Sequence, residues 1–271
     1  MPAEPNIVEP LLRLGSFALA LVTLVAAERL TPRRPQRLDR LLRWPGNLGI
    51  GMLNTFVVRL LLPASAVGFA VAVENRGLGL LNMSATSPAI AAILAFLILD
   101  LAIYMQHRAL HHFPLLWRMH RMHHVDADVD VTTALRFHPL EIAFSMLVKL
   151  SIIAVLGAPA GAVLAFEIIL NVCAMFNHSN IHIPEWLDRP LRRLVVTPDM
   201  HRVHHSVLQS ERDSNFGFNL SLWDRLLGTY TPEPAGGHLR MRLGLANYAA
   251  RDGTRMHRML TDPFSKPADN G

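Results

Sequence analysis

The chain has 271 residues, of which 51% are apolar and only 17% are charged. Soluble domains carry about 25% charged residues, so this composition disfavours a soluble fold and favours a membrane protein. The formal net charge of +5 comes mostly from arginine, and no basic-aromatic pattern indicates a nucleic-acid partner. The single cysteine, Cys173, excludes an internal disulfide, a zinc-thiolate finger and a cysteine-ligated iron–sulfur cluster.

Five apolar stretches are predicted to be membrane helices, because about 20 helical residues cross ~30 Å of hydrocarbon. They are residues 11–28, 47–73, 87–106, 140–156 and 159–176. The first is expected to be a membrane helix and not a signal peptide, since the ten residues at the start of the chain contain two Glu and no Lys or Arg. The last two are short, so a re-entrant hairpin is the alternative to two full crossings.

The loop after the first predicted helix is rich in arginine. Residues 29–43 contain six Arg, and the positive-inside rule places such a loop in the cytoplasm. Alternation along the chain then puts residues 107–139, everything after 177 and all 14 histidines on the cytoplasmic side. The loop either docks an acidic electron carrier or binds anionic lipid head groups. Frequent Ala and Arg indicate a bacterial source, and hence the inner membrane.

We expect one all-α membrane domain over residues 1–271, with four to five transmembrane helices and a cytosolic helical cap. The spanning helices occupy 11–176 and include histidine clusters at 107–124. The cap occupies 177–232 and carries further histidines, and a tail follows at 233–271. Two histidines of the tail, His238 and His257, are predicted to lie on the surface.

Ten histidines recur at helical spacing. The sequence H-R-x-H-H occurs twice, and two further pairs are spaced i, i+4, which places imidazoles on one face of a helix. Such a dense cluster would repel itself if protonated, whereas neutral imidazoles can share a metal. Ten ligands exceed the four to six that one ion takes, so the spacing predicts two metals. The ten are His107, His111, His120, His123, His124, His178, His182, His201, His204 and His205.

An all-imidazole ligand set suits iron, zinc or copper and excludes calcium and magnesium, which prefer oxygen. The segment "DADVD" at 126–130 is not a calcium loop, because Val131 and Phe137 stand where the loop requires Gly and Glu. His112 and His138 lie near the clusters but outside their spacing, so they are not counted as ligands.

Several other polar residues lie near the histidines or within the apolar stretches. Asp100 shares a helix stripe with His107 and is predicted to orient a ligand imidazole. Asn177, Asn180 and Asp199 are candidates for the same supporting role, with helix capping as the alternative. Lys149 and Glu167 lie at similar depth on either side of the 157–161 turn and are predicted to form an ion pair. Each of these assignments is tested by the contacts that the side chain makes.

The order of these motifs resembles the fatty acid hydroxylase/sterol desaturase superfamily of integral-membrane di-iron oxidases. The resemblance rests on "HRALHH", "LLWRMHRMHH", "RFHPLE", "FNHSNI", "VTPDMHRVHHS" and "DSNFGFNLSLWDRLLGTY", over about residues 95–232, with "GLANY" and "DPF" as weaker matches. It implies that the ten histidines bind two Fe ions, which Zn could replace in purified material. It also implies O2-dependent hydroxylation or desaturation of a lipid C–H bond.

Electrons for such a reaction must come from a separate reductase, ferredoxin or cytochrome, because the chain has no G-x-G-x-x-G dinucleotide motif. Two other functions fit the sequence less well. A membrane metal-binding or transport protein would place ligands along the membrane path, but the five apolar stretches contain no histidine. A zinc-dependent lipid hydrolase usually has H-E-x-x-H, which is absent. The oxidase is therefore expected, with the lipid left open.

Overall fold

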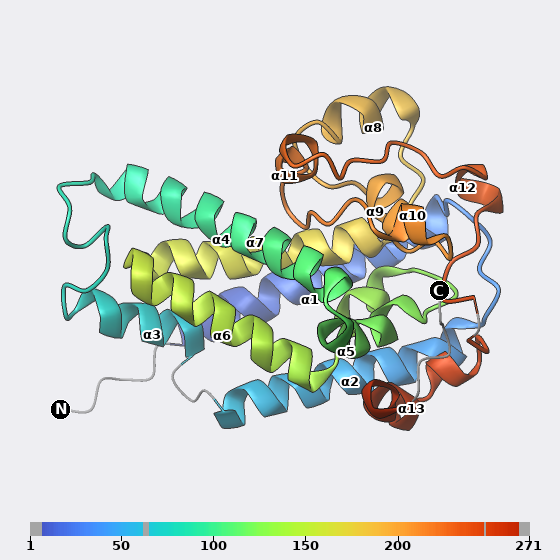
Figure 1. The fold of residues 1–271 in the computed structure, drawn as a ribbon, viewed down its shortest axis with the longest axis horizontal. Helices are drawn as coiled ribbons and strands as arrows, with labels where there is room; N and C mark the ends of the chain where they lie inside the picture. The colour runs from blue at the N-terminus through green and yellow to red at the C-terminus, as the bar shows by residue number, and fades with distance from the viewer. Residues whose placement is uncertain (1–6, 62–64, 247, 266–271) are drawn as a thin grey trace.

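The computed structural model describes residues 7–61, 65–246 and 248–265. Within these ranges the chain is helical, and no β-strand forms. Long apolar helices lie side by side at one end of the molecule, and short helices and loops form a cap at the other end (Figure 1). The predicted all-α fold is confirmed.

The long helices form the bundle. They are α1 (Val8–Leu30), α2 (Arg40–Leu61), α3 (Ser65–Glu74), α4 (Pro88–His112), α6 (Pro139–Leu156) and α7 (Ala160–His178). The short elements form the cap. They are α5 (Pro114–His124), η1 (Val131–Leu135), α8 (Glu185–Leu191), α9 (Pro198–His204), α10 (Gln209–Arg212), α11 (Leu222–Leu226), α12 (Gly237–Arg240), η2 (Asp252–Thr254), α13 (Met256–Thr261) and η3 (Asp262–Phe264).

Five helical stretches of the described chain are long and apolar enough to cross a membrane, as the sequence predicted. They are α1, α2 together with α3, α4, α6 and α7. The predicted stretch 47–73 includes residues 62–64, which lie outside the described residues. α2 begins at Arg40, seven residues earlier than the predicted start at 47. By length and composition, the protein is an integral membrane protein.

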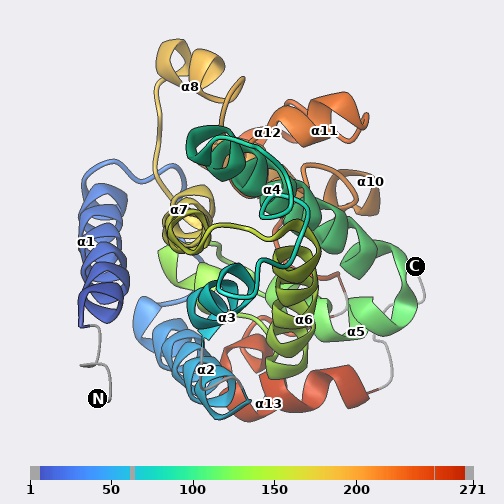
Figure 2. The same cartoon turned by 90° about the vertical axis from the view of Figure 1, so that its left-hand side faces the viewer.

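The core of the bundle forms around α7, which lies between α1, α3 and α4 when the bundle is viewed from its end (Figure 2). Leu99, Ile153 and Phe166 are almost fully buried there. The turn between α6 and α7 contains Gly157, whose φ of 68° ends α6 in the left-handed conformation that glycine adopts without strain. This turn reverses the chain, so α6 runs away from the cap and α7 returns to it, and both helices pack against α3 and α4.

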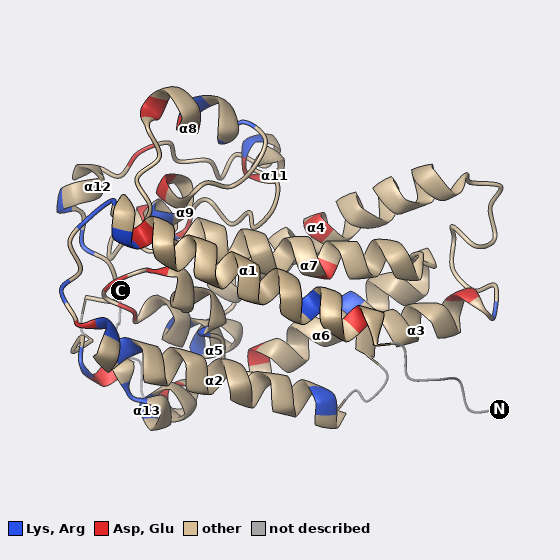
Figure 3. Ribbon diagram, turned by 180° about the vertical axis from the view of Figure 1, so that it is seen from behind, with Lys and Arg blue, Asp and Glu red and all other residues tan. Residues whose placement is uncertain are grey.

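Most charged residues lie at the cap end, and the apolar bundle contains few (Figure 3). Inside the bundle the predicted ion pair is confirmed, because the Nζ atom of Lys149 donates to Glu167. Arg13 of α1 also donates to Glu167, at 2.6 Å. Pairing lowers the cost of placing charges among apolar helices, and it joins α1, α6 and α7.

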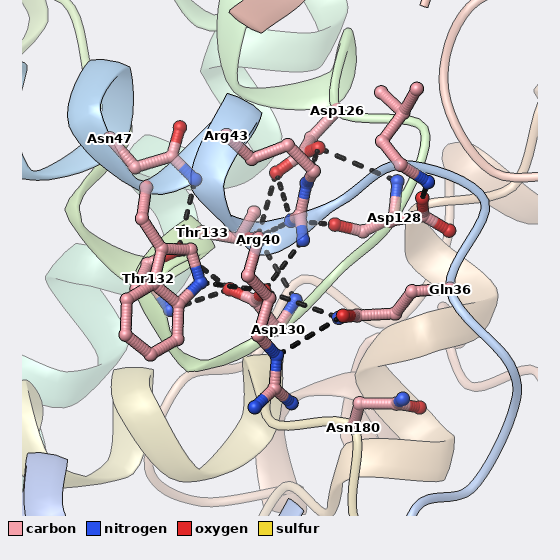
Figure 4. A network of polar contacts seen from close by, with 12 residues as sticks. Gln36, Arg40, Arg43, Asn47, Asp126, Asp128, Asp130, Thr132, Thr133 and Asn180 are labelled. Atoms are coloured by element: carbon pink, nitrogen blue, oxygen red, sulfur yellow. Dashed lines mark hydrogen bonds and ion pairs between the residues drawn. The ribbon is translucent and has the colours of Figure 1, made fainter. Parts of the chain in front are cut away.

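The segment 126–130, which we call the acidic loop, is tied to α2 by Arg43 (Figure 4). The guanidinium of Arg43 donates to Asp126 at 2.8 and 2.9 Å, to Asp130 at 2.5 Å and to the carbonyl of Asp128. The Asp128 carboxylate accepts from the backbone N–H groups of Arg37 and Leu38, both at 2.7 Å. The three carboxylates therefore serve to hold the loop to its neighbours.

One surface prediction is wrong. His238 is buried, with 5% of its surface exposed, and its Nε2 atom lies 3.6 Å from Asp199. The reason is tertiary, since α12 packs against α9 and carries His238 inward. His257 is exposed, as predicted.

Candidate metal centre

The histidines of the cap gather into two adjacent groups. The first group takes two imidazoles from the end of α4, two from α5 and one from α9. Its members are His107, His111, His120, His124 and His204. The second group takes one imidazole from α5, one from the end of α7, one from α9 and one from the residue after α9. Its members are His123, His178, His201 and His205.

The repeated H-R-x-H-H segment contributes to the two groups in opposite ways. In α5, His120 and His124 face the first group, and His123 faces the second. In α9 and the residue after it, His204 belongs to the first group. His201 and His205 belong to the second. In each segment the first and last histidines, four residues apart, lie on one side of the helix. The histidine between them points about 60–100° away from that side, so each segment contributes imidazoles to both groups. The spacing predicted that the histidines of each segment share one helix face, whereas the structure directs them to two different groups.

Proline and chain reversal place these helices. Pro114 is the first residue of α5, and only Phe113 separates it from the end of α4, so the chain turns between His111 and His120 and brings both to one group. Pro198 likewise begins α9. The end of α7 then supplies His178 from the bundle side. The groups therefore lie where the apolar helices meet the cap.

Backbone carbonyl groups fix the outer nitrogen of several imidazoles. Nδ1 of His107 lies 2.7 Å from the Phe216 carbonyl, and Nδ1 of His178 lies 2.6 Å from the carbonyl of Ala174 in its own helix. Nδ1 of His123 lies 3.2 Å from the carbonyl of Arg136, and Nδ1 of His204 lies 2.8 Å from that of Ser214. A carbonyl oxygen only accepts, so each Nδ1 carries the proton and each Nε2 presents a lone pair.

These lone pairs point at one another. The Nε2 atoms of His123 and His178 are 3.0 Å apart, and both rings carry their proton on Nδ1, so no hydrogen bond joins them. In the first group Nε2 of His120 lies 3.1 Å from Nε2 of His107 and 3.2 Å from Nε2 of His124. Lone pairs this close repel unless a cation lies between them. Neutral donors arranged in this way fit a metal ion.

The spacing agrees with metal coordination. The ligand atoms of each group lie within 4.8 Å of one another. Imidazole nitrogens bind zinc at about 2.1 Å, so two ligands at right angles lie ~3 Å apart and two opposite ligands ~4 Å apart. Both distances fall within the observed range. The two groups can each hold one ion, with five and four imidazoles respectively.

The environment keeps the imidazoles neutral. His123, His204 and His205 are fully buried, and burial together with the neighbouring imidazoles holds the pKa of each well below its ordinary value. A neutral imidazole is the form that binds a metal. The site is thus prepared for metal near neutral pH.

His182 belongs to neither group. α7 ends at His178, and the backbone N–H of His182 donates to Thr31, which leaves the side chain exposed. The expected helix face from His178 to His182 therefore does not continue. The two histidines that lie near the clusters in sequence, His112 and His138, also belong to neither group. His112 is exposed, and Nδ1 of His138 caps α6 by accepting from the N–H of Leu140 at 3.1 Å.

None of the four predicted supporting side chains contacts an imidazole of the two groups. Asp100 accepts from the indole N–H of Trp223 at 2.8 Å and from the N–H of Leu220 at 3.3 Å. Asn177 donates to the Phe218 carbonyl at 3.1 Å. These two residues brace segment 216–223, whose Phe216 carbonyl accepts from His107.

The other two supporting residues, Asn180 and Asp199, hold the loop between α1 and α2. Asn180 exchanges hydrogen bonds with the backbone of Arg34, at 2.8 and 3.2 Å. Asp199 is paired with Arg202 and Arg33. Both therefore tie the α1–α2 loop to segments that also carry histidines, the one after α7 and α9.

Two carboxylates that contact the histidines were not assigned from the sequence. Glu141 of α6 accepts from Nδ1 of His120 at 2.8 Å, and both side chains are buried. Asp213 lies 3.3 Å from Nδ1 of His111 and is 42% exposed. Glu141 belongs to the "RFHPLE" motif, which was the one available signal for it. A carboxylate behind a ligand imidazole fixes the ring and strengthens its donor nitrogen.

Comparison with known proteins gives a consistent picture. The fatty acid hydroxylase family profile matches residues 92–229. Ornithine lipid hydroxylase of Rhizobium tropici is 32% identical over 146 residues, which cover 54% of this chain and 43% of that protein. Alkylglycerol monooxygenase of Xenopus tropicalis is 32% identical over 147 residues, covering 52% and 30%. The human alkylglycerol monooxygenase is 29% identical over 224 residues, covering 80% and 46%.

The chain thus spans less than half the length of these relatives. No solved structure matches it. All nine gathered histidines fall within the matched residues 92–229. Eight of them lie in α4, α5, α7 and α9, and His205 directly follows α9.

Proposed function

Because the chain belongs to the fatty acid hydroxylase family, we propose that it is a membrane-bound, non-haem di-iron oxidoreductase that uses O2 to hydroxylate a lipid C–H bond. Hydroxylation is preferred to desaturation, since the relatives named above are a hydroxylase and monooxygenases. We propose the two histidine groups as the metal ligands, and His182 stays a predicted tenth ligand.

The observation that carries this proposal is the pair of buried imidazole groups whose Nε2 lone pairs face one another at 3.0–3.2 Å. Nine neutral nitrogen donors suit borderline metals such as iron and zinc. Iron, when bound, supplies the redox chemistry that allows O2 to attack a C–H bond. A zinc-dependent hydrolase would need fewer imidazoles and an open metal position.

The residues of the chain hold and shield this centre. Phe216, Ser214 and Glu141 fix ring orientation through the outer nitrogens. Burial of the imidazoles excludes bulk water, which protects the reaction from side reactions. The groups lie at the cap ends of apolar helices α4 and α7, so a lipid approaching from the bilayer has a short path to them. A membrane lipid is therefore the substrate class that we propose.

Hydroxylation converts R–H and O2 into R–OH and water, and it consumes two electrons and two protons. The chain has no dinucleotide motif and one cysteine, so we propose that a separate reductase, ferredoxin or cytochrome supplies the electrons. We also propose that the metal end faces the cytoplasm of a bacterial inner membrane, on the basis of the Arg-rich loop at 29–43.

Metal analysis tests the proposal directly. The protein is purified in detergent, reconstituted with ferrous iron without oxygen, and then given O2, a chemical reductant and extracted membrane lipids. We expect about two irons per chain and O2 uptake that depends on lipid. Tight zinc binding without O2 uptake would instead favour the hydrolase, and metal binding without any turnover would favour the metal-storage alternative.

A further inference from the structure

A cavity of about 430 Å³ lies at the loop between α1 and α2. Its walls are residues 32–36 together with Arg40 and Asn180. Three of its seven lining residues are arginines, Arg33, Arg34 and Arg40, and none is acidic. The volume falls in the range of small-ligand sites, which is about 300–1,000 Å³. The wall composition indicates an anionic ligand.

The three arginines differ in how their charge is compensated. Arg33 pairs with Asp199 at 2.9 Å, and Arg40 pairs with Glu28 at 3.0 Å. Arg34 has no carboxylate partner among the described residues. Its guanidinium donates only to two backbone carbonyls, those of His238 at 3.2 Å and Met241 at 2.9 Å.

Arg34 is only 8% exposed, and its Nε atom is buried without a hydrogen-bond partner in the described chain. A buried cation of this kind is costly until an anion neutralises it. Burial, Arg202 and Arg37 lower the pKa of Arg34, and the carboxylate of Asp128 only partly opposes them. An oxyanion with two or more oxygens matches the donor fork of a guanidinium.

The position of the cavity favours a lipid over a soluble anion. The loop joins two helices that are each apolar enough to cross the membrane. Leu30 at the end of α1 and Leu41 at the start of α2 are each 81% exposed, so bare apolar surface flanks the cavity on both sides. A ligand with a charged head and an apolar tail satisfies both surfaces at once.

We propose that this cavity binds the phosphate-bearing headgroup of an anionic membrane phospholipid, with Arg34 as its main contact. The floor of the cavity is joined to the metal centre by backbone. The N–H of Arg33 donates to the Asn180 carbonyl at 2.9 Å, two residues after His178. A bound headgroup would therefore hold the α1–α2 loop against the segment that follows α7. The proposal does not depend on which reaction the metal centre catalyses.

Native mass spectrometry of the metal-loaded, detergent-purified protein tests this site. Phosphatidylglycerol and phosphatidylcholine with identical acyl chains are titrated separately, and a dissociation constant is obtained for each. We expect phosphatidylglycerol to bind the wild-type protein about tenfold more tightly, because both lipids carry the phosphate but the arginines repel the choline cation of phosphatidylcholine. Equal binding of the two lipids would overturn the proposal.

Three variants locate the binding. Arg34→Gln is expected to abolish the preference, and Arg34→Lys to weaken it, because lysine keeps the charge but loses the planar fork. Arg37→Gln is the matched control, since Arg37 lies in the same loop, is exposed and does not line the cavity. If Arg34→Gln does not fold, the site is tested by comparing Arg34→Lys with the control Arg37→Gln. If Arg37→Gln loses the preference for phosphatidylglycerol to the same extent, the preference comes from general surface charge, and the proposed site is wrong.

Two competitors distinguish other occupants. Inorganic phosphate is expected to displace phosphatidylglycerol only weakly, because it lacks the apolar tail. If phosphate binds as tightly as the lipid, the site takes free phosphate and the lipid assignment is wrong. Poly-glutamate is expected to leave the bound lipid in place. If it displaces the lipid in the wild-type protein but not in Arg34→Lys, an acidic protein is the occupant and the proposal fails.

Discussion

Two neighbouring regions of the cap bury dense polar side chains and differ in how those side chains are satisfied. In the acidic loop, the carboxylates of Asp126 and Asp130 both pair with one guanidinium, that of Arg43 (Figure 4). In the metal centre, imidazoles face imidazoles, and the lone pairs of His123 and His178 meet at 3.0 Å. The first region balances its charges internally, whereas the second brings together neutral donors of the kind that could hold a metal ion.

This difference separates a structural network from a ligand site when both consist of buried polar residues. The acidic loop has the composition of a calcium site, yet its oxygen atoms are already engaged by Arg43 and by backbone N–H groups. The histidine groups contain several buried nitrogen atoms without partners, such as Nε2 of His204 and both nitrogens of His205. Unmet donors and acceptors therefore indicate function better than residue type alone.

The largest effect is expected from removing a metal ligand. His204→Ala, in the first group, and His123→Ala, in the second, should each lose about one metal per chain and all lipid oxidation. The loss should exceed the ~10–100-fold drop in metal affinity that follows removal of a supporting partner. Metal content and O2 uptake of the purified variants measure it. His257→Ala is the matched control, because His257 is exposed and outside both groups.

Retained turnover in His204→Ala or His123→Ala would contradict the assigned centre. Loss of metal in His182→Ala would show instead that His182 is a ligand, as the spacing predicted.

Breaking the acidic loop should reduce stability and leave the metal centre intact. Arg43→Met leaves two buried carboxylates without their cation, which costs about 3–5 kcal/mol of unfolding free energy. Thermal unfolding in detergent measures this loss, and the folded fraction should keep its metal. Arg37→Gln, an exposed site in the same region, should change stability by less than about 0.5 kcal/mol.

The triple variant Arg43→Met, Asp126→Asn, Asp130→Asn should regain part of that stability, because the orphaned charges are removed together. If the triple variant is no more stable than Arg43→Met, the network is not held by charge pairing.

The supporting carboxylates should have an intermediate effect. Glu141→Gln removes the anion behind His120, and we expect metal affinity to fall about 10–100-fold. Asp213→Asn should have a smaller effect, because Asp213 is 42% exposed and lies 3.3 Å from His111, so water can replace it. Competition with a metal chelator measures both affinities. If the two variants lose metal affinity equally, the burial of a carboxylate does not determine how strongly it supports its ligand imidazole.

Helical spacing pointed to nine histidines that the structure gathers, but it did not predict their division into two groups. The i, i+3, i+4 pattern placed His120, His123 and His124 together on α5, and all three do reach the centre. Their assignment to two different groups depends on which helices pack on each side, and α9 approaches from 80 residues further along the chain. Periodicity within one helix contains no information on that packing.

Supporting contacts were harder to predict for the same reason. Glu141 lies 21 residues after His120 and follows no periodic pattern with it. Asp100 was predicted to orient an imidazole because it shares a helix stripe with His107, but the side chain instead meets Trp223 from the cap. His238 is buried by the packing of α12 on α9. Membrane stretches were predictable because composition alone determines them.

The smallest effect is expected from the acid dependence of the loop. Burial acts to raise the pKa of Asp130, but Arg43 and the hydrogen bonds from Thr132 and Trp44 outweigh it, so the pKa lies below its ordinary value. A carboxyl group with a lowered folded-state pKa stabilises the fold above its unfolded pKa of about 3.9, and this contribution is lost as the pH falls through the folded value.

Asp130→Asn removes that one titration. The variant should therefore be less stable than the wild type above pH ~4, and the difference should shrink on further acidification by an amount on the order of 1 kcal/mol. Unfolding temperatures measured between pH 6 and pH 3 give the two curves. Curves that stay parallel across this range would mean that Arg43 does not favour the charged form of Asp130, and the acidic loop would then owe its order to hydrogen bonds that a neutral amide also makes. The contrast with the metal centre would weaken accordingly, since neither region would then depend on an ionic charge of its own.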